Sequence, residues 1–177
     1  MSRPSEIHLE VANDPVAWAS VAEMFREYAG GLEFPLDFQG FDAELANLPG
    51  AYAEPRGTLL LARIDGRLAG AVGLRPLETG TCEMKRLYVR PGFRGTGVGR
   101  ALAQAVVAAA EARGYERMRL DTVPSMVGAI ALYRSMGFVD IPSYRYNPIP
   151  GAVYLEKRLR PRPSLDGPTG GGSTRGR

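Results

Sequence analysis

The chain has little of several residue types on which common functional sites are built. Its 177 residues include one cysteine, Cys82, and one histidine, His8, which excludes an internal disulfide and a histidine-rich metal site. No stretch approaches the ~20 consecutive apolar residues that a membrane span requires. The first ten residues lack the apolar centre of a signal peptide. We therefore expect a cytoplasmic protein with no metal and no membrane partner.

Net positive charge is also small, and it is confined to one end. The formal net charge is +3, and the arginines and the single aspartate of residues 160–177 account for all of it. The rest of the chain is neutral and carries no nucleic-acid-reading motif, which disfavours a nucleic-acid partner. Lys85 and Lys157 are the only lysines among 22 basic residues. This arginine bias, with abundant Ala, Gly and Pro, indicates a GC-rich bacterial genome.

The sequence divides into one domain, residues 1–159, and an Arg/Pro/Gly-rich tail, residues 160–177. With 45% hydrophobic residues, the chain is long enough to bury a sizeable core. The tail has almost no large apolar side chain, so burial cannot offset the entropy of ordering it. We expect the tail to be disordered.

The spacing of hydrophobic residues changes several times along the domain and predicts alternating strands and helices. Strands are expected at residues 7–11, 58–64, 67–74, 81–89, 117–121, 138–141 and 152–159. Helices are expected at residues 15–29, 41–48, 98–113 and 126–136, with Asp14 and Ser125 as caps of the first and the last. The strand–helix–strand order of the second half favours a mixed α/β (α+β) fold. We expect a twisted mixed sheet of about six to seven strands with helices on both faces.

The most informative segment joins the strand at residues 81–89 to the long helix. Its consecutive residues are Arg94, Gly95, Thr96, Gly97, Val98, Gly99 and Arg100. Three glycines in five positions allow the main chain to approach a ligand closely. They fall where the first N–H groups of the helix, at the positive end of its dipole, bind anions. With charge-assisted bonds from the two arginines, the segment predicts a phosphate site.

Two familiar phosphate-binding loops do not fit this segment. A nucleoside-triphosphate loop needs Lys and then Ser or Thr after the last glycine, and Arg100 and Ala101 stand there. A dinucleotide fingerprint starting at Gly95 needs a small residue at position 100, which is Arg100. One starting at Gly97 needs a small residue at position 102, which is Leu102. On this segment alone, a helix start that is merely glycine-rich stays open.

A second block completes a resemblance to the GNAT superfamily of N-acetyltransferases. Arg94, Gly97 and Gly99 match the family's acetyl-CoA motif, Arg/Gln-x-x-Gly-x-Gly/Ala. Residues 129–138, AIALYRSMGF, resemble its second block, A-x-x-L-Y-x-x-x-G-F. The resemblance implies an acetyl-CoA-dependent acyltransferase with a GNAT-like sheet. A non-catalytic acyl-CoA-binding or sensing domain of the same fold is the alternative.

The resemblance also implies roles for particular residues. Leu87, Tyr88 and Val89 would lie along the pantetheine arm, with backbone groups of the first and third pairing with it. The amides of residues 95–100 would hold the pyrophosphate, and Tyr133 would be the general acid for the departing thiolate. Many members carry Asn where this chain has Met126, and the neighbouring Ser125 is the candidate to replace its hydrogen bonds. Tyr133 as an ordinary core aromatic is the alternative for that residue.

The chemistry of acetyl transfer to an amine adds one further candidate. With a single histidine no Ser-His-Asp set exists, and Cys82 as an acyl carrier is the less favoured route, so direct attack in a ternary complex is expected. An alkyl amine with a pKa of about 10.4 is mostly protonated at neutral pH and needs a base. Glu83 is the candidate base, directly or through water. Its alternative is an ion pair with Lys85, two residues along the same strand face.

The acceptor amine is not identified by the sequence. Two segments combine acidic and aromatic residues that suit a small amine or a peptide N-terminus, and both can equally be surface loops: Glu33, Phe34, Asp37 and Phe38, and then Tyr144, Arg145, Tyr146 and Asn147. The expected partners are acetyl-CoA and this acceptor, in a monomer or homodimer.

Overall fold

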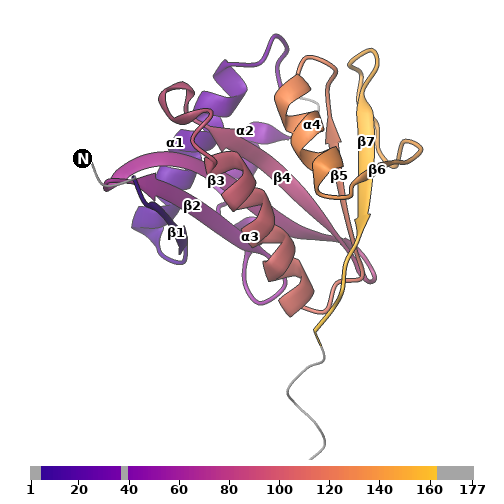
Figure 1. The fold of residues 1–177 in the computed structure, drawn as a ribbon, viewed down its shortest axis with the longest axis horizontal. Coiled ribbons are helices and arrows are strands. Elements are labelled where there is room, and N and C mark those ends of the chain that lie inside the picture. Colours follow the sequence, from indigo (N-terminus) through magenta and orange to yellow (C-terminus); the bar gives the residue numbers. More distant parts are fainter. Residues whose placement is uncertain (1–4, 37–39, 163–177) are drawn as a thin grey trace, which may run out of the picture.

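The computed structural model of the protein describes residues 5–36 and 40–162, and these form one mixed seven-stranded sheet with helices (Figure 1). The strands are β1 (Ile7–Val11), β2 (Thr58–Ile64), β3 (Arg67–Glu78), β4 (Thr81–Val89), β5 (Arg117–Thr122), β6 (Val139–Asp140) and β7 (Val153–Arg158). The helices are α1 (Pro15–Gly30), α2 (Phe41–Ala46), α3 (Val98–Ala112) and α4 (Val127–Ser135), with short 3-10 turns η2 (Gly50–Tyr52) and η3 (Pro91–Phe93). The strand order is β1-β2-β3-β4-β5-β7-β6. The predicted mixed fold is confirmed.

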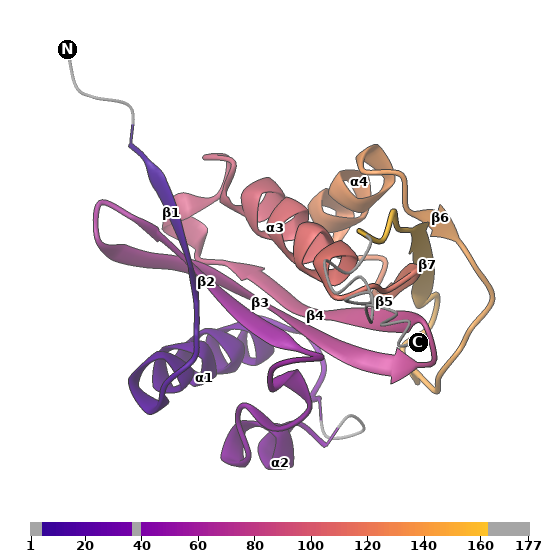
Figure 2. The ribbon, with the colours of Figure 1, turned by 90° about the horizontal axis from the view of Figure 1, so that it is seen from below.

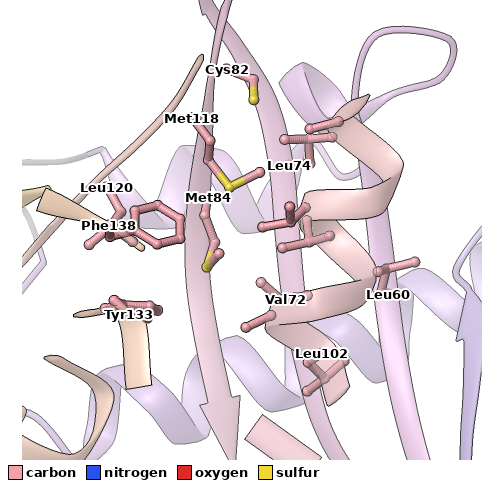
Figure 3. Close-up of a cluster of buried hydrophobic side chains, with 14 of the residues drawn as sticks. Leu60, Val72, Leu74, Cys82, Met84, Leu102, Met118, Leu120, Tyr133 and Phe138 are labelled. Carbon is pink, nitrogen blue, oxygen red and sulfur yellow. The ribbon is translucent and has the colours of Figure 1, made fainter. Parts of the chain in front are cut away.

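Helices cover both faces of the sheet. Figure 2 shows α1 and α2 against one face and α3 and α4 against the other. Each face has its own buried apolar cluster, and Figure 3 shows part of the one beneath α3 and α4, including Leu102, Met84 and Met118. None of the helices in the described part of the chain is long and apolar enough to cross a membrane.

The helix ends show where local sequence rules hold and where one fails. Asp14 caps α1 as predicted, because its Oδ1 accepts a hydrogen bond from the Ala17 amide at 2.8 Å. Ser125 does not cap α4. The N-cap of that helix is Met126, and no side chain makes a cap hydrogen bond there. The prediction of a Ser125 cap is therefore wrong, and the first N–H groups of α4 have no side-chain acceptor from the cap residue.

The sheet opens in the middle, between β4 and β5. These two strands are the parallel pair of the sheet, and their register ends after three positions, at Glu83 opposite Arg119. Beyond that point β5 continues to pair with β7 through Thr122, while β4 continues along β3 to Val89. The facing edges of β4 and β5 therefore part just before the glycine-rich segment.

A bulge in β4 adds to this opening. Lys85 lies opposite Gly73 and Tyr88 lies opposite Ala71, so two residues of β4 face a single residue of β3. Arg86 takes up the extra length with a φ of +59°. Its buried guanidinium then reaches the α2 face, where it pairs with Glu44 and lies over the Phe41 ring.

The start of the predicted tail lies against α3. The Arg160 amide donates to Glu111 Oε1 at 3.3 Å, and the Arg162 amide donates to the Glu111 carbonyl at 3.1 Å. The chain therefore stays in contact with the body for three residues beyond the predicted boundary. The predicted disorder of residues 163–177 lies outside the described residues.

Gly57→Ala is expected to lower the thermal midpoint by about 5 °C. A Cβ at this position would lie 2.6 Å from the Tyr52 carbonyl carbon and 2.7 Å from the Leu74 carbonyl oxygen, and both are backbone atoms that cannot turn aside. Overpacking of this kind costs about 1–3 kcal/mol, and each kcal/mol shifts the midpoint by about 2–4 °C in a domain of this size. Differential scanning calorimetry measures the shift. Gly30→Ala, whose Cβ would meet nothing within 4 Å, is the control, and equal midpoints for the two variants would contradict the prediction.

Candidate active site

A cavity of about 560 Å³, the large cavity, lies beside the end of β4 and the start of α3. The predicted cofactor residues that line it are Leu87, Tyr88, Val89, Arg94, Gly95, Gly99 and Ser125. Helix α4 contributes further residues, and Tyr28, Leu32 and Glu33 line it from the end of α1 and the loop after it. The segments that the sequence analysis selected for cofactor binding therefore meet at one cavity.

The other predicted cofactor residues lie beside this cavity without lining it. The Thr96 hydroxyl donates to the Phe93 carbonyl, and Arg100 donates to Ser135 Oγ at 3.2 Å. Val98 is buried in the core beneath α3. Gly97 is the N-cap residue of α3, with a φ of +92° that disfavours any side chain there. What these positions can offer a ligand is mainly their main chain.

The start of α3 keeps its helix-terminal donors free of a cap side chain. Gly97 has no side chain to accept a bond from the first N–H groups, so these donors suit an anionic ligand. Arg94 adds a cation at the cavity wall, although its Nε also donates to the Val89 carbonyl at 3.1 Å.

A much smaller cavity of about 30 Å³, the small cavity, lies where β4 and β5 have parted. It shares four lining residues with the large cavity: Tyr28, Leu87, Met126 and Ala129. The remaining lining comes from residues 84–86 of β4, residues 120–122 of β5, and Tyr133 of α4. This volume is enough for about one water molecule, and several of the lining groups are polar.

Tyr133 lines the small cavity and also belongs to the apolar core. It is 6% exposed, and its ring packs against Phe138 with the ring centroids 5.8 Å apart (Figure 3). Burial raises the pKa of Tyr133 above its ordinary value, so the hydroxyl keeps its proton at neutral pH. The Tyr133 side chain is therefore a core aromatic, and it also lines a cavity in which its hydroxyl could act as an acid. Its acid role stays a prediction.

Glu83 is fully buried in an ion-pair network and lines neither cavity. Its Oε1 lies 2.9 Å from Arg75, and its Oε2 lies 2.6 Å from Arg145 and accepts the Tyr144 hydroxyl at 2.7 Å. Both oxygens are therefore engaged. Glu83 thus forms ion pairs, as the alternative to the base role predicted, and the partners seen are Arg75 and Arg145 where Lys85 was expected. Its role as a base stays a prediction.

Charged side chains from several elements form ion pairs around residues 83–86 of β4. We call them the charged cluster: Glu44, Arg75, Glu83, Lys85, Arg86, Asp121 and Arg145. Lys85 Nζ lies 3.7 Å from Asp121 Oδ1, and both side chains are nearly fully buried. Burial lowers the pKa of Lys85 to about 8, and the carboxylates of Glu83 and Asp121 oppose part of that shift. Asp121 and Arg75 have no local sequence signal of a site, because their partners lie on other strands.

The candidate acceptor segments are only partly joined to the cavities. Glu33 lines the large cavity, and Phe34 packs against the apolar cluster beneath α1. Asp37 and Phe38 lie outside the described residues. In the loop before β7, Tyr144 and Arg145 bond to Glu83, and Asn147 donates to Asp121 Oδ2 at 3.2 Å. This loop therefore borders the charged cluster.

The residues set aside by the sequence analysis lie apart from both cavities. Cys82 is buried, its Sγ lies 3.4 Å from the Arg117 carbonyl oxygen, and burial raises the pKa of its thiol to about 12. The thiolate form that an acyl carrier needs is therefore scarce at neutral pH. His8 lies on β1, opposite Arg63. Across residues 5–36 and 40–162, no group of three or more His, Cys, Asp or Glu side chains is arranged to hold a metal ion.

Comparison with known proteins gives one consistent family. The model of the Acetyltransferase (GNAT) family matches residues 18–138. The chain is 38% identical over 161 residues to the uncharacterized N-acetyltransferase C1271.07c of Schizosaccharomyces pombe, a match that covers 90% of this chain and 99% of that protein. A GNAT-family acetyltransferase from Staphylococcus aureus Mu50 has a TM-score of 0.71 at 19% identity and covers 87% of this chain and 99% of its own. The structure of yncA from Salmonella typhimurium with its cofactor acetyl-CoA has a TM-score of 0.67 at 19% identity, over 92% and 99% of the two chains.

The matched range contains both sequence blocks on which the resemblance was based. It runs from α1 through the glycine-rich segment to Phe138, and so includes every residue that lines either cavity. The solved structures share the mixed sheet and confirm the predicted fold. The chain therefore belongs to the GNAT family of acetyltransferases.

Proposed function

We propose that this protein transfers the acetyl group of acetyl-CoA to an amine acceptor, by direct attack in a ternary complex. The observation that carries the proposal is that two cavities with four lining residues in common lie between the uncapped helix start of α3 and the Tyr133 side chain. Membership of the GNAT family supports acetyl transfer, and the acetyl-CoA bound by a protein of the same fold supports the choice of co-substrate.

Residues at one end of the large cavity fit the charged part of coenzyme A. The uncapped N–H groups at the start of α3 and the guanidinium of Arg94 provide donors for a pyrophosphate. The cavity-lining stretch Leu87–Val89 lies beyond the last residue pair between β4 and β5, so within residues 5–36 and 40–162 its edge toward β5 has no strand partner. An extended amide-bearing arm can pair with that edge as an added strand does.

The other end of the pathway fits the reacting group. Positioning of two reactants next to each other supplies much of the rate of such a transfer. Tyr133 carries a proton at neutral pH, and it lines the small cavity, which shares four lining residues with the large one. We assign it the role of giving that proton to the departing sulfur.

Titration calorimetry with acetyl-CoA, followed by an acceptor screen read by mass spectrometry, tests this proposal. Binding of acetyl-CoA together with an acetyl adduct on an amine and release of the thiol would support it. Failure of the protein to bind acetyl-CoA would overturn it. Binding without any thiol release across amines, amino acids and peptides would favour the acyl-CoA sensor.

Tyr133→Phe is expected to lower kcat by about 10²-fold or more, because it removes the hydroxyl that protonates the thiolate. The affinity for acetyl-CoA should stay within twofold, since this side chain does not line the large cavity and its ring still packs against Phe138. Steady-state thiol release and calorimetry measure the two quantities. Tyr115→Phe removes a hydroxyl that bonds to the Arg56 carbonyl, away from both cavities, and should keep the wild-type kcat. Full activity of the Tyr133 variant would refute the acid role.

A further inference from the structure

Lys85 and Asp121 form a buried pair across the opening between β4 and β5. The two side chains are 5% and 3% exposed, and Nζ lies 3.7 Å from Oδ1. Asp121 is held from its other side by Asn147, which donates to Oδ2 at 3.2 Å. Desolvating an ion pair is costly, and its attraction often does no more than offset that cost, so a buried pair is weak evidence of a stabilising role.

This pair borders the small cavity and thereby reaches the proposed reaction site. Both side chains line that cavity together with Tyr133. The cavity has room for about one water molecule, and it shares Leu87 and Met126 with the lining of the large cavity. A water in it can contact the pair on one side and a group entering from the large cavity on the other.

We propose that Lys85, held in place by Asp121, accepts the proton that the acceptor amine loses, through a water in the small cavity. This inference rests on the proposed acetyl transfer and adds a base to it. Glu83 is a poorer candidate, because both of its oxygens are bound by Arg75, Arg145 and Tyr144 and it lines neither cavity.

The surroundings of Lys85 suit a base that works near neutral pH. Among the residues that the structure describes, charged groups that act on it are Glu83 and Arg86 from β4, Asp121 from β5 and Arg145 from the loop before β7. Their balance with burial lowers the pKa of Lys85 to about 8, so part of the population is neutral and able to take a proton. A general base is most effective when its pKa lies near the working pH.

An alkylammonium acceptor loses two protons in becoming an amide. One passes through the water to the neutral Nζ of Lys85, which later releases it to solvent. The amine nitrogen then bonds to the thioester carbon, the carbon–sulfur bond breaks, and the sulfur leaves with the electron pair. The second nitrogen proton replaces the one that Tyr133 has given to the sulfur.

Lys85→Arg separates a proton acceptor from a structural cation. Arginine keeps the positive charge beside Asp121 but does not lose its proton at working pH. We expect kcat on the alkylamine found in the acceptor screen to fall by about 10²-fold or more, with acetyl-CoA affinity within twofold. Lys157→Arg changes the only other lysine, which bonds to the Met136 carbonyl away from both cavities, and should keep the wild-type kcat. A wild-type rate in the Lys85 variant would overturn the inference.

A second measurement, the titration of Lys85 followed by NMR, needs no acceptor amine. Because the chain has two lysines, labelling with [ε-13C]lysine yields two NMR signals, and the Lys157→Arg variant assigns them. The Lys85 signal should titrate with a midpoint near its lowered pKa of about 8, and Asp121→Asn should move that midpoint lower by removing a negative charge. A Lys85 signal that stays fully protonated up to pH 10 would overturn the inference. Wild-type protein that binds no acetyl-CoA would instead refute the proposed function itself.

Discussion

Gly99→Leu is expected to weaken acetyl-CoA binding at least about 100-fold, a loss of about 2.8 kcal/mol. Gly99 lies in the first turn of α3 and lines the large cavity. A Cβ there would lie 3.6 Å from a Val89 methyl and 3.8 Å from a Leu132 methyl, so a longer side chain projects between β4 and α4. The residue is not among the glycines with positive φ, so the helix can accept leucine while the ligand loses its space.

Titration calorimetry on the folded variant measures this loss. Gly92→Ala is the matched control, since Gly92 lies in η3 outside the cavity lining and a Cβ there would meet nothing within 4 Å. We expect it to bind as the wild type does. Retention of wild-type affinity by the Gly99 variant would place acetyl-CoA elsewhere and remove the basis of the proposed function.

Glu83→Gln is expected to lower the thermal midpoint by roughly 10 °C. Removal of one partner from a buried ion pair costs about 3–5 kcal/mol, because the remaining charge stays desolvated. The lower end applies here, since the Arg75 and Arg145 side chains are 23% and 21% exposed and water can partly solvate them. At about 2–4 °C per kcal/mol for a domain of this size, calorimetry should resolve the shift easily.

The same variant also separates the two roles considered for Glu83. If the residue is structural, kcat measured well below the new midpoint should stay close to the wild-type value. A loss of about 10²-fold under those conditions would instead make it the base and contradict the assignment to Lys85. Glu10→Gln breaks the more exposed pair with Arg63 and should cost under about 1 kcal/mol.

Much of the fold could be predicted because its signals are local. The strands at residues 58–64 and 81–89 match their predicted bounds, since each is followed closely by turn residues, Asp65–Gly66 and Pro91–Gly92. The strand predicted at residues 67–74 extends to Glu78, because its last residues pair with the start of β4 in spite of their polar side chains and Pro76. Here pairing with a neighbouring strand overrides the local pattern.

The residues of the candidate site also fall into two groups, those with a local sequence signal and those that meet only in the folded structure. Gly95, Gly99 and Tyr133 could be selected because each lies in a short motif whose chemistry is local. Lys85 and Asp121 could not, because they meet only through the parallel register of β4 and β5 and the parting of the strands beyond it. Arg75 is an intermediate case, since it lies directly opposite Glu83 in the hairpin register.

The three-position seam between β4 and β5 has a mechanical consequence. The strands β1–β4 and the strands β5–β7 form two parts of the sheet, and these parts are joined through only three paired positions. A ligand in the large cavity can hydrogen-bond to the edge of β4 beyond the paired positions and contact α4 on its other side. Such a ligand connects the two parts of the sheet. We therefore expect the ligand-bound protein to be more rigid than the free protein, because the ligand joins the two parts of the sheet.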